Sequence, residues 1–546
     1  MSWEAVKEAR QKLGRERGTV CKDWGGKIHI ALVYPNAYYL GMSSLGFQTV
    51  YGILNSYSNI VCERVFWDPQ KRKPEQPIGL ESQRPLPDFD VLAFSLSYEL
   101  DYFNVVQIFK TSGIPLLAAD RDERHPLVIA GGPCVTANPM PLSSFFDCFA
   151  IGEGEAILPN LINALTDGIE GKKDELLKKL ASVPGVYIPA FYDGKPIKRQ
   201  WLAELDSVAT TSVILTPDTE FSNMYLIEIA RGCGWGCRFC LAGYHFRPFR
   251  FRPLDTLIKQ AENGLKYTNR IGLLAAAVSD HPEIGELAHW LQRLNAEISV
   301  SSLRVRPSSQ ALLRALAKSG AQTVTLAPEA GSERLRRIIN KCVTESDIVE
   351  AVDKIAKLGI RQVKLYYMIG LPHETDADID EITKLTLALK QRAEGTVTRL
   401  AITVEPFVPK AGTPFQWLPM ASEEVLDERT NRLKNGLAKS GIDVRTESAG
   451  WSLVQGVLAR GDARLGDVLS RMPQNSLAAW RRAMQDCNLK ADSYIHREIP
   501  SDEALPWSVL DSGIKIDYLR GELDKARCGI ETPPCPPVEC RKCGVC

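Results

Sequence analysis

The sequence has no surplus of either charge and no long apolar run. Lysine plus arginine and aspartate plus glutamate each number 66 among the 546 residues, so nothing in the overall charge draws the chain to nucleic acid or an anionic membrane. No uninterrupted apolar stretch is long enough to span a bilayer. The N-terminal stretch MSWEAVKEARQKLGRERG is charged and lacks the apolar centre of a signal peptide. These absences lead us to expect a cytoplasmic protein.

Cysteine is too sparse for a disulfide scaffold, with 14 residues in the whole chain. Eight of the cysteines nevertheless form two groups, and grouped cysteines in a reducing compartment are typical of metal ligands. The first group is Cys233, Cys237 and Cys240, and the second is Cys528, Cys535, Cys540, Cys543 and Cys546.

Short apolar stretches alternate with helical patterns through the first third of the chain. The expected strands cover residues 27–33, 61–67, 89–95, 126–130 and 148–155. This alternation predicts an α/β domain, a Rossmann-like parallel sheet with helices on both faces. Ligands of such sheets bind at the carboxyl ends of the strands, where this sequence places glycine, serine and proline.

The pattern restarts after residue 222 with six more strand and helix pairs, which predict a partial, TIM-like (β/α)6 barrel. Its expected strands cover residues 224–232, 273–280, 299–305, 323–332, 362–372 and 399–409. The first cysteine group follows the first of these strands, so it should lie at the reactive face of the barrel. The expected domains are an N-terminal helix (1–20), the Rossmann-like domain (21–185), a linker (186–222), the barrel (223–420), a charged helical region (421–520) and a cysteine-rich tail (521–546).

The motif Arg231-Gly-Cys-Gly-Trp-Gly-Cys-Arg-Phe-Cys240 places three thiols within eight residues. Four cysteines would close a cubane iron–sulfur cluster, and three leave one iron open to another ligand. Three cysteines are also compatible with a zinc site or with part of a closed electron-transfer cluster. No fourth cysteine follows nearby, and His245 is the only close histidine. The long α/β region downstream argues against a small zinc module.

This spacing, with its glycines and with Phe239 before the last cysteine, resembles the radical S-adenosylmethionine (radical SAM) superfamily. The resemblance implies that Cys233, Cys237 and Cys240 hold a [4Fe-4S] cluster whose open iron binds SAM. An electron from the cluster then splits SAM and gives a 5′-deoxyadenosyl radical, so the cofactors supply the chemistry and the protein positions them. We identify no catalytic residue beyond the cofactor ligands.

The barrel carries further features that resemble SAM contacts in this superfamily. They lie, in order, at the ends of the second and fourth expected strands and on and after the fifth. The resemblance implies SAM contacts at Phe239, Ser279, Asp280, Glu329, Gly331, Ser332, Lys364 and Gly370. Arg247, Arg250 and Arg252 follow the cysteines. They are either a solvated face or a site for a carboxylate or phosphate.

The N-terminal region resembles the cobalamin-binding domain found ahead of many radical SAM barrels. The resemblance rests on, and implies cobalamin contacts at, Gly41, Ser43, Ser44, Ser95, Ser97, Tyr98, Glu99, Gly131, Gly132, Gly152 and Gly154. The DxHxxG motif, whose histidine binds cobalt from below, is absent. His29 and His125 fall in or before strands, so cobalamin would bind without a protein histidine. The alternative is a vestigial domain that binds nothing.

The tail has enough cysteines for four zinc thiolates or for an auxiliary iron–sulfur cluster, with one cysteine to spare. The alternative is a disordered terminus whose cysteines bind nothing. The compact Cys540-x2-Cys543-x2-Cys546 spacing favours a metal or cluster.

Together these features predict an enzyme that cleaves SAM reductively and uses cobalamin, with methyl transfer to an unactivated carbon as the leading reaction. One alternative is an enzyme that modifies RNA or protein, for example by sulfur insertion, with an auxiliary tail cluster. Another is a non-enzymatic iron–sulfur redox sensor. Either enzyme would need a reductant such as flavodoxin or ferredoxin. The substrate is a small molecule or a macromolecule, and no membrane is expected as a partner.

Overall fold

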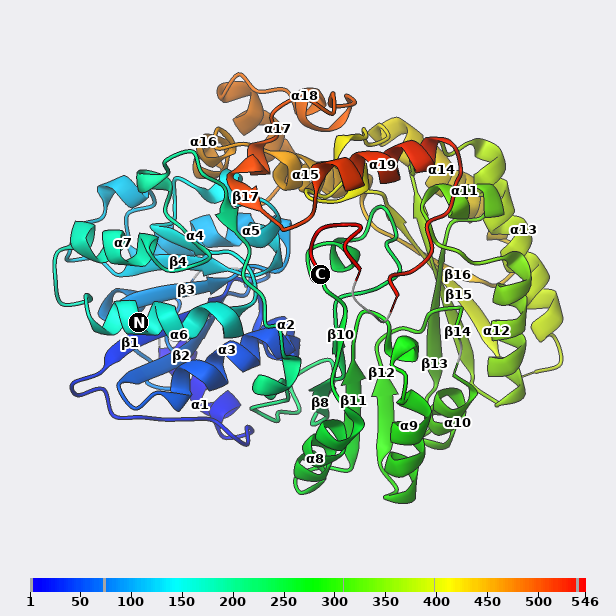
Figure 1. Ribbon diagram of the computed structural model, residues 1–546, viewed down its shortest axis with the longest axis horizontal. Coiled ribbons are helices and arrows are strands. Elements are labelled where there is room, and N and C mark those ends of the chain that lie inside the picture. The colour runs from blue at the N-terminus through cyan, green and yellow to red at the C-terminus, as the bar shows by residue number, and fades with distance from the viewer. Residues whose placement is uncertain (1–2, 72–74, 308, 397, 537–539) are drawn as a thin grey trace. The chain divides into compact units, whose positions relative to one another are not determined.

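The computed structural model describes residues 3–546 except 72–74, 308, 397 and 537–539. The chain divides into two compact units that are each built from separate segments. The first unit comprises Met1–Asn223, Leu458–Lys490 and Ala504–Gly513, and the second comprises Met224–Val457, Ala491–Glu503 and Ile514–Cys546. Figure 1 shows the elements of both units. Among the described helices, none combines the length and the apolarity needed to cross a bilayer.

The first unit is built on a six-stranded sheet in the order β2-β1-β3-β4-β5-β6. The strands are β1 (Ile28–Tyr34), β2 (Ile60–Phe66), β3 (Val91–Ser95), β4 (Leu127–Gly131), β5 (Cys148–Ala150) and β6 (Val186–Tyr187). The first five run parallel, and β6 pairs antiparallel with β5. The predicted parallel α/β sheet is therefore confirmed.

Helices cover both faces of this sheet. The unit contains α1 (Trp3–Leu13), α2 (Tyr38–Ser43), α3 (Leu45–Ser56), α4 (Tyr102–Ser112), α5 (Pro133–Ala137), α6 (Gly154–Thr166) and α7 (Lys173–Ala181). The chain returns with α16 (Leu465–Arg471) and α17 (Leu477–Asp486). Ile30 and Leu32 of β1 belong to the apolar core that α3 and α6 share. Phe94 of β3 stacks on Phe109 of α4. Successive residues of a strand point to opposite faces of the sheet, so different helices cover the two faces.

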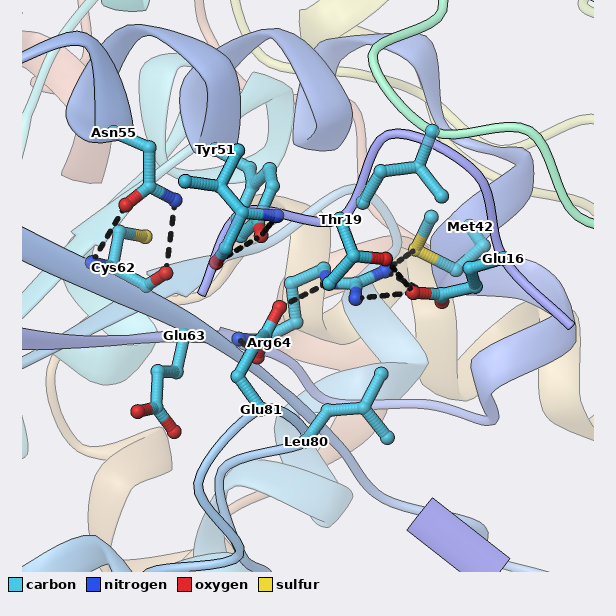
Figure 2. Close-up of polar contacts among 12 residues, drawn as sticks. Glu16, Thr19, Met42, Tyr51, Asn55, Cys62, Glu63, Arg64, Leu80 and Glu81 are labelled. Carbon is cyan, nitrogen blue, oxygen red and sulfur yellow. Dashed lines mark hydrogen bonds and ion pairs between the residues drawn. The ribbon is translucent and has the colours of Figure 1, made fainter. Parts of the chain in front are cut away.

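A buried ion cluster fixes two loops to the edge of the sheet (Figure 2). Arg64 of β2 donates from Nη2 to Glu16 Oε2 at 2.7 Å and from Nε to Glu81 Oε1 at 2.8 Å. The side chains of Arg64 and Glu16 have no exposed surface, and that of Glu81 is 4% exposed. Buried charges persist only when they are paired and hydrogen-bonded, and both conditions are met here.

The second unit is an open barrel of parallel strands. One sheet has the order β12-β11-β8 and the other β13-β14-β15-β16, and a parallel bridge between Leu303 and Leu326 joins them. The strands are β8 (Tyr225–Glu228), β11 (Arg270–Leu274), β12 (Glu297–Val300), β13 (Thr323–Glu329), β14 (Gln362–Ile369), β15 (Arg399–Pro406) and β16 (Asp443–Thr446). The predicted (β/α) barrel is confirmed. A short seventh strand, β16, lies in the region expected to be mostly helical.

Helices surround the barrel (Figure 1). They are α8 (Leu254–Leu265), α9 (Ile284–Arg293), α10 (Gln310–Lys318), α11 (Glu333–Ile338), α12 (Glu345–Lys357), α13 (Asp376–Ala393) and α14 (Glu423–Leu437). Alternate residues of β14, such as Val363 and Leu365, are fully buried beneath them. The residues between, such as Lys364 and Tyr366, are only half-buried and face the barrel interior. The interior is therefore an open, partly polar space, unlike the packed core of a complete barrel.

The rest of the chain adds α15 (Ala449–Arg460), α18 (Ala491–Ile495) and α19 (Ile516–Arg527). In the second unit, the described tail residues after α19 form no further helix or strand.

Candidate metal and cofactor sites

The cysteine motif forms a tight loop at the carboxyl end of β8, and residues 232–240 are called the cluster loop below. Before it, β9 (Ala230–Arg231) pairs antiparallel with β10 (Arg250–Phe251), which closes the loop at its base. Gly232 has a φ of +81°, and a Cβ there would lie 2.3 Å from the carbonyl oxygen of Phe246. Only glycine fits so close to another backbone segment. Cys233 and Cys237 are buried, and Cys240 is half-buried.

Neighbouring residues hold the cluster loop through its carbonyl groups. Asn340 donates from Nδ2 to the carbonyls of Trp235 at 3.1 Å and Gly236 at 3.2 Å. The Tyr244 hydroxyl also donates to the Gly236 carbonyl, at 3.1 Å. His245 is buried and its Nε2 bonds the carbonyl of Ala411 at 2.7 Å. A loop fixed through its backbone leaves its thiol side chains for a ligand.

The three thiols of the cluster loop lie close enough to affect one another. Burial, together with the neighbouring Cys237 and Cys240 thiols, raises the pKa of the Cys233 thiol to about 12. Burial also raises the pKa of the Cys240 thiol, while the Lys341 ammonium acts in the opposite direction. Bound cations reverse this balance, because a metal stabilises the thiolate form. Within the described residues, no three His, Cys, Asp or Glu side chains gather around a point suited to a single metal ion.

Polar side chains at the ends of β11 and β12 surround the cluster loop. Trp235 donates from Nε1 to Asp280 Oδ2 at 2.5 Å, and the Arg304 guanidinium lies 4.0 Å from the centre of the Trp235 ring. Asp280 ends the short 3-10 helix η8 (Val278–Asp280). The predicted strand over 273–280 instead ends at Leu274, and the turn that follows brings Ser279 and Asp280 toward the cysteines.

Three buried polar atoms beside the cluster loop have no hydrogen-bond partner among the described residues. They are Ser279 Oγ, Asp280 Oδ1 and Arg304 Nη2. Buried polar groups are almost always paired, so such a group of unpaired atoms indicates a missing ligand. A hydroxyl, a carboxylate and a guanidinium together complement a ligand that carries both an amine and a carboxylate, as the methionine part of SAM does. The residues present therefore fit SAM.

A second polar group lies at the ends of β13 and β14. Lys341 is buried and pairs with Glu329 Oε1 at 3.0 Å. Glu329 has a φ of +69°, at a point where the register between β13 and β14 shifts. A left-handed residue other than glycine is strained and is often found at a functional site. Lys364 faces the barrel interior, with its Nζ 4.8 Å from the centre of the Tyr366 ring.

Other residues expected to contact SAM already have structural partners. Ser332 caps α11 by accepting from the Leu335 N–H, and it donates to Asp378 Oδ1 at 2.5 Å. A Cβ on Gly331 would lie 2.4 Å from the carbonyl oxygen of Asp378. Gly370 has a φ of +75° and donates its N–H to Glu374 at 2.6 Å. Phe239 is half-buried in the cluster loop. SAM contacts at these four positions stay predictions.

The three arginines after the cysteines are buried, so the solvated-face interpretation is wrong. Arg252 has no exposed surface and donates from Nε to the Glu228 carbonyl at 2.9 Å. Arg250 donates to the Pro248 carbonyl at 3.0 Å, and Arg247 lies between the rings of Tyr244 and Tyr518. These side chains brace the segment that follows the cluster loop.

In the first unit, the residues expected to bind cobalamin lie at the carboxyl edge of the sheet. Ser95 ends β3, and Ser97, Tyr98 and Glu99 follow it; Gly131 ends β4, and Gly132 follows it; Gly152 and Gly154 follow β5. The strand order reverses between β1 and β3, since β2 lies on the other side of β1. Ligands of doubly wound sheets bind at such a switch point.

Several of these residues also make contacts that stabilise the local fold. Gly132 has a φ of +111°, and a Cβ there would lie 2.5 Å from the carbonyl oxygen of Leu96. Gly41 packs against the Phe66 ring, where a Cβ would lie 2.5 Å from Cε1. Ser44 caps α3, and Ser43 donates to the Tyr39 carbonyl. These contacts shape the edge of the sheet, and cobalamin contacts here stay predictions.

Sequence reasoning missed a buried polar group at the switch point. Asn36 donates from Nδ2 to Asp101 Oδ1 at 2.7 Å, and Asn104 donates to the Pro35 carbonyl at 2.9 Å. Burial raises the pKa of the Asp101 carboxyl from its ordinary 3.8 to about 7. Three large side chains at the same edge are exposed, namely Tyr39 (49%), Leu40 (44%) and Tyr98 (43%). Neither Asp101 nor the exposed residues of α2 belong to a recognisable motif.

Two family models match this chain. The model described as "Radical SAM proteins, N-terminal" matches residues 46–189, and that of the radical SAM superfamily matches residues 227–386. An uncharacterized protein of Methanocaldococcus jannaschii is 33% identical over 465 residues, covering 83% of this chain and 94% of the relative. The chain therefore belongs to the radical SAM superfamily. Its N-terminal unit carries the N-terminal domain of radical SAM proteins, and the barrel carries the SAM-cleaving core.

Other similarities are lower in sequence identity. The tRNA-2-methylthio-N(6)-dimethylallyladenosine synthase of Wolbachia pipientis is 23% identical over 42% of this chain and 53% of the relative. The chain thus spans about half the length of that protein. Among solved structures, the cobalamin-dependent S-adenosylmethionine radical enzyme OxsB has a TM-score of 0.49 at 11% identity, over 92% of this chain and 79% of that one. The methyltransferase TsrM from Kitasatospora setae has a TM-score of 0.47 at 13% identity, over 73% and 80%.

Proposed function

We propose that this radical SAM enzyme binds SAM beside the cluster loop, uses cobalamin, and methylates an unactivated carbon of its substrate. The observation that carries the SAM site is the set of unpaired buried atoms on Ser279, Asp280 and Arg304, next to Trp235 of the cluster loop. A redox sensor has no need of such a set, so an enzyme is favoured over a sensor.

Each group has a defined set of residues. Cys233, Cys237 and Cys240 would hold the [4Fe-4S] cluster. Ser279, Asp280 and Arg304 would hold the amino-acid end of SAM. When bound, the cluster would supply an electron for SAM cleavage and cobalamin would carry the methyl group. A small redox protein such as flavodoxin or ferredoxin would deliver the electron.

The carboxyl edge of the first unit supports cobalamin binding. Cobalamin is broad, with a corrin ring whose faces are apolar and whose rim carries amide side chains, and a surface with exposed Tyr39, Leu40 and Tyr98 offers apolar contact at the switch point. Gly132 keeps the loop after β4 close to the end of β3, where its missing side chain leaves room for the backbone of Leu96.

The barrel interior would receive the substrate. Lys364 and Tyr366 of β14 and Thr403 and Glu405 of β15 face it, and Tyr366 is paired in register with Thr403. None of these four side chains is fully buried. They would orient a polar substrate so that one carbon faces the radical.

The first experiment is anaerobic reconstitution with iron, sulfide and hydroxocobalamin, followed by gel filtration and measurement of iron and cobalt per chain. Retained cobalt, with about four irons or more, supports the proposal. Release of 5′-deoxyadenosine and S-adenosylhomocysteine from SAM then reports the two uses of SAM. Iron without cobalt contradicts the cobalamin part.

Variants separate the cluster from the SAM site. Cys237→Ala should abolish SAM cleavage, and unchanged cleavage would refute the cluster assignment. Arg304→Met should keep the iron and weaken SAM binding, measured by calorimetry, by about tenfold or more for the loss of one charged hydrogen bond. Cys487→Ala, at the C-terminal end of α17, is the matched control and should change neither quantity.

A second candidate is sulfur insertion into RNA or protein. It is favoured by the similarity to tRNA methylthio-synthases and by a contact between the tail and the cluster loop, where the Cys535 N–H donates to the Gly234 carbonyl at 2.7 Å. RNA binding that weakens steeply with salt, together with transfer of labelled sulfur to RNA, would favour this candidate over methylation.

A further inference from the structure

The C-terminal tail of the second unit is attached directly to the cluster loop. The Cys535 N–H donates to the Gly234 carbonyl at 2.7 Å, and a Cβ on Gly234 would lie 3.8 Å from Cys535 Cβ. Asn340, which holds the cluster loop, also exchanges two hydrogen bonds with the backbone of Thr532, at 2.8 and 3.1 Å. The tail and the cluster loop are therefore neighbours within one unit.

A buried arginine of the cluster loop fixes the start of the tail. Arg238 has no exposed surface and donates to the carbonyls of Ile338 and Ile530, each at 2.7 Å. It also pairs with Glu522 of α19 at 3.2 Å, and the Thr532 hydroxyl donates to the same carboxylate. This network makes a freely disordered tail inconsistent with the structure up to Thr532.

The far end of the tail is held as well. The carbonyl of Cys543 accepts from the Lys515 N–H at 2.8 Å, just before α19, and Cys543 is only 3% exposed. The chain thus leaves α19, passes the cluster loop at Cys535 and returns to the start of α19 at Cys543.

Four of the five tail cysteines follow one another closely in the sequence, with four residues between Cys535 and Cys540 and two between each later pair. The backbone of this stretch is held at Cys535 and at Cys543. Cys528 differs, because it is exposed at the C-terminal end of α19.

We propose that Cys535, Cys540, Cys543 and Cys546 bind a second metal centre through four thiolates, docked against the cluster loop. Four thiolates hold either an iron–sulfur cluster or a zinc ion. No three described side chains gather around a point suited to a single ion, so an iron–sulfur cluster, whose cysteines lie farther apart, is the expected occupant. The site is distinct from the cluster of Cys233, Cys237 and Cys240, and it goes beyond the proposed methyl transfer.

The surroundings suit a negatively charged centre. Four thiolates exceed the charge of a zinc ion or of a typical cluster, so a nearby cation stabilises the complex. Arg247 is 2% exposed, stacks on the Tyr518 ring of α19 at 5.4 Å and acts on both Cys535 and Cys546. Residues 537–539, between two of the ligands, lie outside the described residues.

The test uses the full chain in which Cys233, Cys237 and Cys240 are all replaced by alanine, so that only tail metal is counted. After anaerobic purification and reconstitution, iron, sulfide and zinc per chain are measured by elemental analysis and absorption spectroscopy. We expect about four irons per chain to remain. Adding Cys540→Ser and Cys543→Ser should remove this metal, and adding Cys528→Ser should not.

Cys546→Ser provides a variant in which folding is not at stake, because this residue is exposed. It should lower the metal content or change the spectrum of the bound cluster. Iron in place of zinc identifies the centre as a cluster, and zinc in place of iron identifies a structural ion. The proposal is overturned if the triple-alanine chain binds no metal, or if the tail variants retain as much as Cys528→Ser. Because the catalytic cysteines are absent throughout, neither result depends on SAM cleavage.

Discussion

Replacement of Gly232 by alanine should release the catalytic cluster, because this glycine closes the base of the cluster loop. Its φ of +81° disfavours every residue with a side chain, at a cost of about 1–2 kcal/mol. An alanine Cβ would also lie 2.3 Å from the carbonyl oxygen of Phe246. That carbonyl belongs to the backbone, so it cannot rotate away as a flexible side chain could. The loop must shift, and its three thiols shift with it.

The magnitude follows from these two terms. The backbone conformation alone corresponds to a factor of about 5–30 in the occupancy of the native loop, and the contact with Phe246 adds to it. We therefore expect cluster affinity to fall by about tenfold or more. Gly234→Ala is the matched control, since its Cβ would meet only ordinary contacts, 3.4 Å to the Phe249 ring and 3.8 Å to Cys535.

The assay is iron and sulfide per chain after anaerobic reconstitution, in a background of Cys540→Ser and Cys543→Ser that removes the proposed tail metal. SAM cleavage is measured in the same samples. Gly232→Ala should lose most of its iron and its cleavage activity, and Gly234→Ala should keep both. Equal iron in the two variants would refute the argument that backbone geometry at Gly232 sets the cluster site.

Two further predictions concern the first unit. Arg64→Met should lower the free energy of unfolding by about 3–5 kcal/mol, because the buried carboxylates of Glu16 and Glu81 would lose their shared cationic partner. The measurement is chemical denaturation. The control is Arg124→Met, which removes an exposed arginine paired with Asp122 and should leave stability unchanged. Asp101→Asn should remove a pH dependence. Asp101 has a pKa of about 7 in the folded state and about 3.8 in the unfolded state, so between these pH values only the folded state keeps the proton. Wild-type stability therefore falls as the pH rises from 3.8 to 7, by about 4 kcal/mol in total, and this contribution stays constant above pH 7. An unfolding midpoint of Asp101→Asn that keeps the wild-type slope from pH 4 to 7 would contradict this reasoning.

Local patterns in the sequence were sufficient to predict the parallel sheet of the first unit and the six main strands of the barrel. Strands such as Ile28–Tyr34 and Leu127–Gly131 are short apolar runs whose residues are almost all buried, and buried parallel strands have this composition. The cysteine loop could also be predicted, because its ligands lie within eight residues and need no tertiary information. The strand Asp443–Thr446 could not, since its sequence DVRT alternates half-buried and exposed residues and has no apolar run.

The residues around the proposed SAM site and the cluster loop were harder to find. Arg304 lies in a loop after β12 and Asn340 in a turn after α11, far from the cysteines in sequence. Each is a single polar residue without a motif, and only the folded barrel brings it to the cluster loop. Ser332 illustrates the opposite difficulty. Its motif resembles a SAM contact, and in the structure its side chain caps α11 and donates a hydrogen bond to Asp378. Sequence alone does not separate these two roles.

The contacts between the tail and the cluster loop also bear on how the two metal sites depend on each other. Two hydrogen bonds described above join them directly, from the Cys535 N–H to the Gly234 carbonyl and from Arg238 to the Ile530 carbonyl. Asn340 bridges them with two further bonds to Thr532. Each contributes about 0.5–1.5 kcal/mol, so their sum is a few kcal/mol. The cluster loop also has hydrogen bonds that do not involve the tail, namely those from Asn340 to the Trp235 and Gly236 carbonyls and from the Tyr244 hydroxyl to the Gly236 carbonyl. Removal of the tail metal should therefore loosen the catalytic cluster without expelling it, because most of the backbone contacts that set the loop do not involve the tail.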